Sequence, residues 1–205
     1  MRIEWVNNAA FILSSGSVRL MCDPWLEGKI FNGGWKLLSE TRFPYGDFAY
    51  IMHIWISHEH PDHFSPPTPR RIPEAYRRGI TILFHYTKDK RVLNACRSLG
   101  FKTWELREKE LVDLAPDFRL MCGRQGLLDS WLAVFAEGKT LLNMNDCVFD
   151  RKGQLKTIKS LVKRPDVLLS QFSYANWVGN PEDHECHRHE WRREQNPRYL
   201  PVHGQ

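Results

Sequence analysis

Three histidines and an aspartate within six residues constrain this chain more than any other feature of its sequence. The run reads His58-Glu59-His60-Pro61-Asp62-His63. An apolar segment at residues 50–56 precedes it and predicts a buried strand, so we expect the run on the loop that leaves this strand. Its first two histidines can point the same way in an extended chain, and the proline stiffens the turn that brings the last two residues close by. This density of imidazole and carboxylate groups predicts a site for zinc, iron or manganese, although a surface loop could hold the same residues without a metal.

Length and composition predict one folded domain. At 205 residues, with 42% hydrophobic and 12% aromatic residues, the chain is long enough for a substantial core. We therefore expect a single domain over residues 1–205. The net charge of +5 is dispersed rather than gathered into one tract. Nucleic-acid binding is therefore permitted but not indicated, and an anionic substrate explains the charge equally well.

The cysteines and the N-terminal sequence bear on the cellular compartment. The five cysteines include no CxxC pair, which disfavours both a disulfide framework and a structural zinc site. The first residues lack a signal-peptide pattern, and no apolar run approaches the roughly 20 residues that span a bilayer. These features predict a cytoplasmic protein without membrane contact.

Hydrophobic patterning predicts a mixed α/β fold. Strands are expected at residues 2–6, 9–14, 17–22, 80–84, 101–106 and 118–122, in a hairpin of 130–136 with 140–144, and at a buried segment, 166–170. Helices are expected at 72–78, 88–99 and 153–162. Strands and helices that recur in two halves predict two sheet-plus-helix layers packed as a sandwich. Residues 27–49 are expected to form a long loop, either functional or packed over the sheet.

The motif at residues 58–63 resembles the signature of the metallo-β-lactamase-fold superfamily. The resemblance implies an αββα sandwich of two mixed β-sheets with helices on the outer faces. It also implies one or two divalent metal ions that activate a water, with ligands among His58, His60, Asp62 and His63. Asp146 directly follows an apolar strand and matches the superfamily's aspartate that lies between the two metals. In isolation it could equally be a turn or helix-capping residue.

Two further ligand positions follow from the same resemblance. His203 matches the superfamily's last histidine, and because the pattern normally runs on further, we expect a C-terminus that is shortened relative to the family. Another histidine should precede the strand before Asp146, but residues 123–130 contain none. Asp129 could supply an oxygen ligand in its place, or could simply begin the hairpin strand. A carboxylate there would shift the preference of the site from zinc toward iron or manganese.

Several segments narrow the resemblance to one branch of the superfamily. They are residues 4–11, 22–28, 31–35, 129–130 and 143–147. They are similar to the branch that contains ascorbate-6-phosphate lactonase and the metal-binding domain of CMP-N-acetylneuraminate hydroxylase, in which Asp-Ser replaces the missing histidine. The hydroxylase also carries a Rieske iron–sulfur domain. This chain lacks the two Cys/His pairs that such a cluster needs, so we do not expect it to perform that oxygenation alone.

Ligand-type and aromatic residues also gather near the C-terminus. Trp177 and Asn180 lie in a stretch of aromatic and amide residues that suits a substrate-binding loop, or equally a packed one. His184, His187 and His189 could form an accessory metal site or line the substrate entrance. A solvated, charged segment is the plainer interpretation of these histidines.

Together these features predict a hydrolase that uses metal-activated water. Asp62 would ligate a metal, or orient the water and act as general base. The resemblance suggests a small anionic substrate, such as a phosphorylated or nucleotide-linked sugar, a lactone or a phosphodiester. One alternative is an iron-binding oxidoreductase component that works with a partner redox protein, and another is a non-catalytic partner subunit with an incomplete site. A homo-oligomer is compatible with each, and no basic-aromatic tract supports a nuclease.

Overall fold

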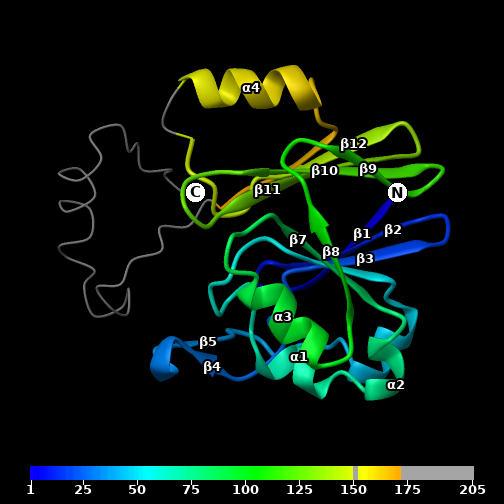
Figure 1. Ribbon diagram of the computed structural model, residues 1–205, viewed down its shortest axis with the longest axis vertical. Coiled ribbons are helices and arrows are strands. Elements are labelled where there is room, and N and C mark those ends of the chain that lie inside the picture. The colour runs from blue at the N-terminus through cyan, green and yellow to red at the C-terminus, as the bar shows by residue number, and fades with distance from the viewer. Residues whose placement is uncertain (150–151, 172–205) are drawn as a thin grey trace, which may run out of the picture. The chain divides into compact units, whose positions relative to one another are not determined.

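Two β-sheets form the framework of the computed structural model, which describes residues 1–149 and 152–171 (Figure 1). The first sheet has six strands in the order β1-β2-β3-β6-β7-β8. Their bounds are Arg2–Asn7, Ala10–Ser15, Val18–Cys22, His53–Ile56, Thr81–His85 and Lys102–Leu106. The first three strands are antiparallel neighbours, whereas β3, β6, β7 and β8 run parallel to one another. The sheet is therefore mixed, and its parallel strands all end at one edge.

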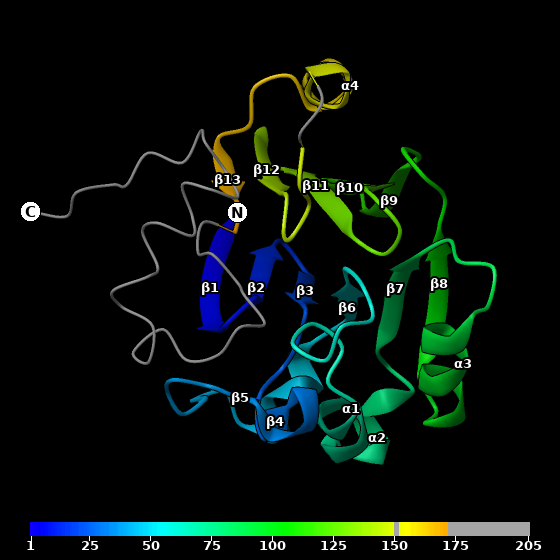
Figure 2. The same cartoon turned by 90° about the vertical axis from the view of Figure 1, so that its left-hand side faces the viewer.

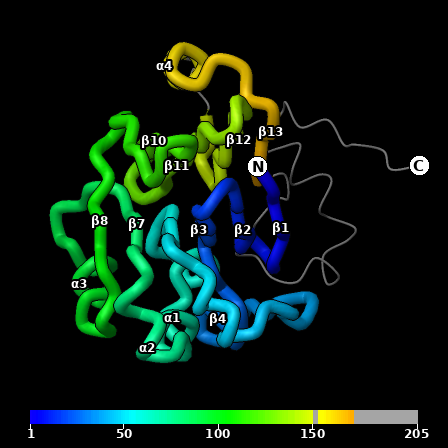
Figure 3. The backbone as a smooth tube through the Cα atoms, turned by 90° about the vertical axis from the view of Figure 1, so that its right-hand side faces the viewer, coloured from blue at the N-terminus to red at the C-terminus, as the bar shows by residue number. Residues whose placement is uncertain are grey.

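The second sheet has five strands in the order β13-β12-β11-β10-β9. In chain order from β9, their bounds are Leu111–Ala115, Phe118–Arg124, Ser130–Ala136, Lys139–Asn143 and Val167–Leu169. Only the pair β12/β13 is parallel. A small ribbon pairs β4 (Lys29–Ile30) with β5 (Trp35–Lys36) around the 3-10 helix η1 (Phe31–Gly33). Figure 3 follows the first sheet from β1 to β8, with the second sheet stacked against it.

Side chains of each strand alternate between its two faces, and this alternation builds three apolar layers. In β2, Phe11 and Leu13 pack between the sheets, whereas Ile12 packs on the outer side of the first sheet. In β11, Leu132 packs between the sheets, whereas Trp131 packs on the outer side of the second sheet. Both sheets are thus apolar on both faces, as expected of sheets that are covered on each side.

Helices cover the outer face of each sheet (Figure 2). The first sheet carries η2 (Tyr45–Tyr50), α1 (Pro67–Arg71), α2 (Glu74–Arg77) and α3 (Arg91–Ser98), and the second carries α4 (Lys152–Val162). Helix α3 shows how this cover forms, because Val92, Leu93 and Cys96 lie on one face of the helix and are buried against the sheet. Gly100, with a φ of 91°, ends that helix in the left-handed conformation that glycine adopts without strain. The predicted αββα sandwich of two mixed sheets is confirmed.

The structure corrects several details of the predicted elements. The strand before the motif begins at His53, because Tyr45–Tyr50 forms η2. The segment predicted to be buried at 166–170 is the half-exposed edge strand β13, in which Leu168 is 56% exposed. Strand β9 and helix α1 were not predicted, and the helix expected at 72–78 is limited to α2. The segment 27–49 contains β4, η1, β5 and most of η2 rather than one loop.

Met1–Gln171 forms one compact unit. The prediction of a single domain over residues 1–205 extends beyond the described residues and stays a prediction. Within the described ranges, no helix is both long enough and apolar enough to cross a membrane.

Candidate metal centre

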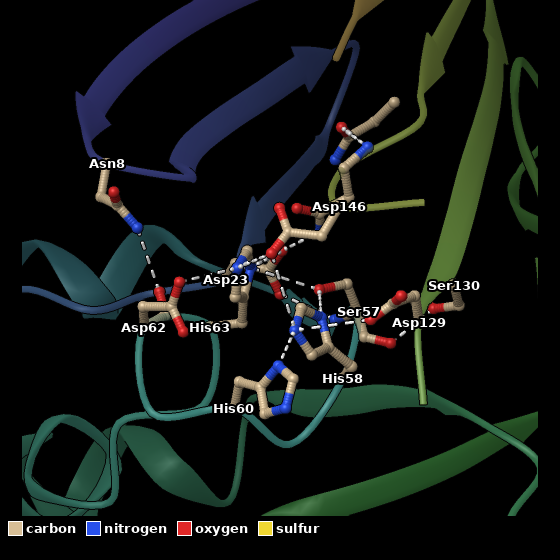
Figure 4. A network of polar contacts seen from close by, with 12 residues as sticks. Asn8, Asp23, Ser57, His58, His60, Asp62, His63, Asp129, Ser130 and Asp146 are labelled. Carbon is tan, nitrogen blue, oxygen red and sulfur yellow. Dashed lines mark hydrogen bonds and ion pairs between the residues drawn. The ribbon is translucent and has the colours of Figure 1, made fainter. Parts of the chain in front are cut away.

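The motif loop lies where both sheets end (Figure 4). It leaves β6 after Ile56, next to Asp23, which directly follows β3. Asp129 directly precedes β11, and Asp146 lies on the loop that follows β12. Gln125 joins these two loops of the second sheet, since its Nε2 donates a hydrogen bond to the backbone carbonyl of Val148, in the loop after β12, at 2.8 Å. Residues from four separate loops therefore meet at one edge of the sandwich.

A first group of candidate ligands comprises His58, His60 and Asp129, whose ligand atoms all lie within 4.8 Å of one another. Nε2 of His58 is 2.9 Å from Nδ1 of His60 and 3.8 Å from a carboxylate oxygen of Asp129. The structure thus brings Asp129, the predicted substitute for a missing histidine, to the two histidines that it would complement.

A second group comprises His58, His63 and Asp146. Nε2 of His63 lies 3.2 Å from Oδ2 of Asp146 and 3.2 Å from Oδ2 of Asp62. The same Asp146 oxygen is 3.9 Å from Nε2 of His58. His58 therefore belongs to both groups. Oδ2 of Asp146 lies within reach of the rings of both His58 and His63, as a bridging ligand would.

The spacing and chemistry of these atoms fit a bound divalent metal. Two ligand atoms that are each about 2.1 Å from one ion, at a tetrahedral angle, lie about 3.4 Å apart. The two contacts of His63 at 3.2 Å are close to that spacing, and the 3.8 Å between His58 and Asp129 suits a wider angle. The six side chains offer three imidazole nitrogens and three carboxylates, a donor set that suits zinc, iron or manganese.

Asp23 holds the motif loop in place and orients one of its histidines. This carboxylate is fully buried, and its Oδ1 accepts a hydrogen bond from the backbone N–H of Ser57 at 2.7 Å. Its Oδ2 accepts a hydrogen bond from Nδ2 of Asn145 at 2.6 Å and lies 3.1 Å from Nδ1 of His63. A carboxylate behind a ligand histidine fixes the tautomer and the orientation of the ring. Asp23 therefore directs Nε2 of His63 toward Asp62 and Asp146.

Two residues that frame the centre adopt left-handed backbone conformations. Asp23 has a φ of 41° and Asn145 a φ of 48°. Positive φ is uncommon outside glycine, although aspartate and asparagine tolerate it better than most residues. Such strain costs on the order of 1 kcal/mol or more and persists where surrounding contacts hold it. The buried hydrogen bond between these two side chains is one such contact.

Two serines connect the sheets next to the ligands. The hydroxyl of Ser130 donates to the backbone carbonyl of Ser57 at 2.5 Å. The hydroxyl of Ser57 in turn lies 2.9 Å from Nδ1 of His58. This contact occupies one ring nitrogen of His58 and leaves Nε2 facing both ligand groups.

The two buried histidines of the centre differ in charge. Burial and the positive charge of His63 lower the pKa of His58 to about 4, so its neutral ring offers a lone pair at neutral pH. Burial alone would lower the pKa of His63, but the charge of Asp23 and hydrogen bonds to Asp146, Asp23 and Asp62 outweigh it and raise that pKa well above its ordinary value. The three carboxylates thus favour a cation at this position, and a metal ion would compete with the proton of His63.

Comparison with known proteins identifies the fold. No protein-family model matches the chain. The metallo-β-lactamase-fold protein YhfI from Bacillus subtilis aligns with a TM-score of 0.54 and 12% identity, over 85% of this chain and 67% of that one. The two mixed sheets, their outer helices and the histidine-rich loop at their edge agree with that likeness. The chain has the metallo-β-lactamase fold.

Two further solved structures resemble this metallo-β-lactamase-fold protein. The β-hydroxylase CmlA has a TM-score of 0.65 and 18% identity, over 81% of this chain and 34% of that one. A possible metal-dependent hydrolase from Veillonella parvula has a TM-score of 0.65 and 17% identity, over 87% of this chain and 74% of that one. At these identities the likeness establishes the fold alone.

Sequence comparison points to hydroxylases. The cytidine monophosphate-N-acetylneuraminic acid hydroxylase of Danio rerio is 30% identical over 183 residues, which is 83% of this chain. The aligned region covers only 29% of that relative's length. The resemblance to this branch is therefore confirmed, while the activity of the much longer relative does not transfer with it.

Six of the predicted site residues come together in this metallo-β-lactamase-fold protein. They are His58, His60, Asp62, His63, Asp129 and Asp146. The remaining candidates, His203, Trp177, Asn180, His184, His187 and His189, lie outside the described residues and stay predictions. Asp23 and Asn145 were not identified beforehand, and their only sequence signal is a polar residue soon after an apolar strand.

Proposed function

We propose that this chain is a metal-dependent hydrolase that acts on a small anionic substrate. The observation that carries the proposal is the pair of three-residue ligand groups that share His58, with Asp146 within reach of both. A structural neighbour described as a possible metal-dependent hydrolase has the same fold, which supports this choice of chemistry.

Six side chains would hold the metal. His58, His60 and Asp129 would bind one divalent ion, and His63 and Asp146, together with Asp62 or the shared His58, would bind a second. Bound there, a divalent ion lowers the pKa of a bound water toward neutral and polarises the carbonyl or phosphoryl oxygen under attack. Compared with a site built on nitrogen or sulfur ligands alone, a site with three carboxylates among six donors has a greater preference for iron or manganese. Zinc also fits this donor set.

Asp62 suits the role of ligand better than that of general base. Burial would raise the pKa of Asp62, but the hydrogen bond and charge of His63 lower it below its ordinary value. A carboxylate with a low pKa accepts a proton poorly at neutral pH, because catalytic bases work best with a pKa near the operating pH. Nδ2 of Asn8 donates to the backbone carbonyl of Asp62 at 3.3 Å, so the turn between β1 and β2 helps to position it.

An iron-dependent oxidoreductase component is the second candidate function. Sequence relatives at about 30% identity are hydroxylases, and a structural neighbour is a β-hydroxylase. The mixed nitrogen and carboxylate donor set suits iron as well as zinc. The four cysteines of the described residues are free and buried, so a redox reaction would draw its electrons from a donor outside these residues.

Metal analysis combined with a substrate screen separates these proposals. The full chain, purified without chelator, is analysed for bound metals and tested on lactones, phosphodiesters and nucleotide sugars, with Asp146→Asn as the comparison variant. Hydrolysis that needs metal and is lost in the variant supports the hydrolase. Iron with an optical spectrum that responds to reductant, without hydrolysis of any substrate class, favours the oxidoreductase. A chain that binds no metal contradicts both.

A further inference from the structure

A small cavity lies at the same edge of the sandwich, beside the metal centre. It has a volume of about 180 Å³, and its lining includes His85, Tyr86, Arg107, Glu108, Gly123 and Arg124. A water molecule occupies roughly 30 Å³ in the liquid, and sites for drug-sized ligands begin at roughly 300 Å³. The cavity is therefore large enough for one charged group, such as a phosphate or a carboxylate, but smaller than the sites that bind drug-sized ligands.

Strand register places this cavity next to the motif loop. Strands β6 and β7 run parallel with Ile56 opposite Phe84, so the next residues, Ser57 and His85, are neighbours at the strand ends. The ring of His85 also forms a hydrogen bond with the backbone of Ser57. In the second sheet, Arg124 at the end of β10 pairs with Ser130, which follows the candidate ligand Asp129. Two residues that line the cavity are thus direct neighbours of the two serines beside the first ligand group.

Two buried polar atoms of the lining residues have no partner. Nδ1 of His85 and Nε of Arg124 are buried and make no hydrogen bond within the described residues. His85 as a whole is only 3% exposed. Buried polar groups are normally hydrogen-bonded, because an unmet donor or acceptor costs about 1–3 kcal/mol. The unpaired Nε–H of Arg124 points to an acceptor group in the cavity that would complete it.

The charges of the cavity favour an anion. The guanidinium of Arg124 donates to the neutral carbonyl of Leu127 at 2.7 Å, and its Nε remains available. Arg107 adds a second guanidinium, and its contact with Glu110 is long, at 3.9 Å. Glu108 is the one carboxylate in the lining, and Lys109 lies 3.0 Å from it. Two guanidinium groups that can bind oxygen atoms in pairs are a common arrangement for phosphate and carboxylate recognition.

Gly123, which lines the cavity, lets the ring of Trp131 pack closely against β10. A Cβ atom on Gly123 would lie 2.2 Å from the ring of Trp131 on the neighbouring strand, so any larger residue would displace that buried ring. The indole therefore packs tightly against the backbone of β10 beside the cavity. This close packing fixes the strand whose next residue is Arg124.

We propose that this cavity is an oxyanion-binding subsite that takes one phosphate or carboxylate group, held by the guanidinium groups of Arg124 and Arg107. The assignment of that group to the substrate rests on the proposed hydrolase function, because the subsite adjoins the first ligand group. Binding of a free anion would use the same contacts.

Titration of the full chain with inorganic phosphate, by calorimetry in the presence of a chelator, tests this proposal without metal-bound phosphate. We expect saturable binding that weakens by about tenfold or more in Arg124→Gln, since hydrogen bonds to charged groups are the stronger ones. Arg107→Gln, at an exposed position, should weaken binding less. Arg119→Gln, an exposed residue of the same strand that does not line the cavity, is the matched control and should bind as the unaltered chain does.

The outcomes separate the site from its ligand. Absence of saturable phosphate binding, or equal weakening in Arg124→Gln and Arg119→Gln, overturns the proposal. Phenyl phosphate that binds at least as tightly as inorganic phosphate supports a subsite for a substrate's phosphate group, whereas binding of inorganic phosphate alone supports a site for a free ion. Because the titration involves no reaction, its failure leaves the hydrolase proposal standing, and a failed activity screen leaves the subsite standing.

Discussion

Replacing Asp23 with asparagine is expected to destabilise the fold and weaken metal binding together. The carboxylate accepts hydrogen bonds on both oxygens, from Ser57 on Oδ1 and from Asn145 on Oδ2, and Oδ2 also lies against His63. An amide of the same shape has one oxygen and one NH₂ group, so in either orientation it turns an N–H toward another donor. The site is fully buried, and no solvent can relieve that conflict.

The magnitude follows from which contacts survive. The better orientation keeps the amide oxygen toward Asn145 and His63 and sacrifices the bond from Ser57, while the full negative charge is lost in both cases. One hydrogen bond to a charged group contributes about 1.5–3 kcal/mol, so Asp23→Asn should lower the free energy of unfolding by at least about 2 kcal/mol. Domains of this kind are stable by about 5–15 kcal/mol, so the variant should still fold. Loss of a carboxylate behind a ligand histidine typically costs about 10–100-fold in metal affinity.

Urea denaturation and metal titration of the full chain measure both effects. Asp113→Asn, an exposed position on β9, is the matched control and should change neither. The pH dependence adds a signature, because the pKa of His63 is raised in the folded chain, partly by Asp23. The stabilisation of the fold by protonated His63 is present below about pH 6.5 and is lost as the pH rises through the raised pKa. The destabilisation by Asp23→Asn should therefore be larger at pH 6 than at high pH. A variant whose stability stays within about 0.5 kcal/mol and whose metal affinity stays within threefold would refute the role given to Asp23.

Three further perturbations probe the site. His60→Ala should remove metal and hydrolytic activity, while the free energy of unfolding changes by less than about 0.5 kcal/mol because the residue is exposed. Elemental analysis checks this, with Glu59→Gln as the control, and metal retained in His60→Ala would refute the ligand assignment. Asp146→Asn should lower the affinity for both ions, and loss of one ion with unchanged affinity for the other would contradict the shared position of this carboxylate. Burial and the positive charge of Arg124 lower the pKa of His85 to about 4, so the unfolded chain takes up a proton at this residue at a higher pH than the folded chain does. The free energy of unfolding should therefore fall by up to about 3 kcal/mol as the pH falls from 6.5 through 4. Acid denaturation of His85→Gln should therefore show a shallower loss of stability over that interval, and an unchanged slope would contradict the burial argument.

The sequence predicted the parts of this protein that local patterns specify. The motif loop was predicted because its ligands are adjacent in the chain and follow an apolar strand. Strand alternation, as in Phe11, Ile12 and Leu13, is likewise local and is confirmed by the layers in which these residues pack. The hairpin of β11 and β12 was predicted from two apolar runs around a turn and is confirmed.

The parts that were missed depend on contacts between distant segments. Asp23 reads as a turn residue before a proline, and its role appears only once the strands bring it to Asn145, which is 122 positions away. The apolar run around Leu168 predicted a buried strand, but β13 lies at a sheet edge, and sequence alone does not show which strands are at the edge. The cavity beside the centre was missed for the same reason, because His85 and Arg124 come from different sheets.

We expect one metal centre, built from the motif loop and from two carboxylates next to strands of the second sheet. Anomalous diffraction from crystals of the full chain grown with manganese or zinc tests this most directly. We expect one or two peaks about 2.0–2.3 Å from Nε2 of His58 or His63, with Asp146 as a ligand and Asp129 completing the group of His58 and His60. Peaks confined to other residues, or a metal held without Asp146, would contradict it.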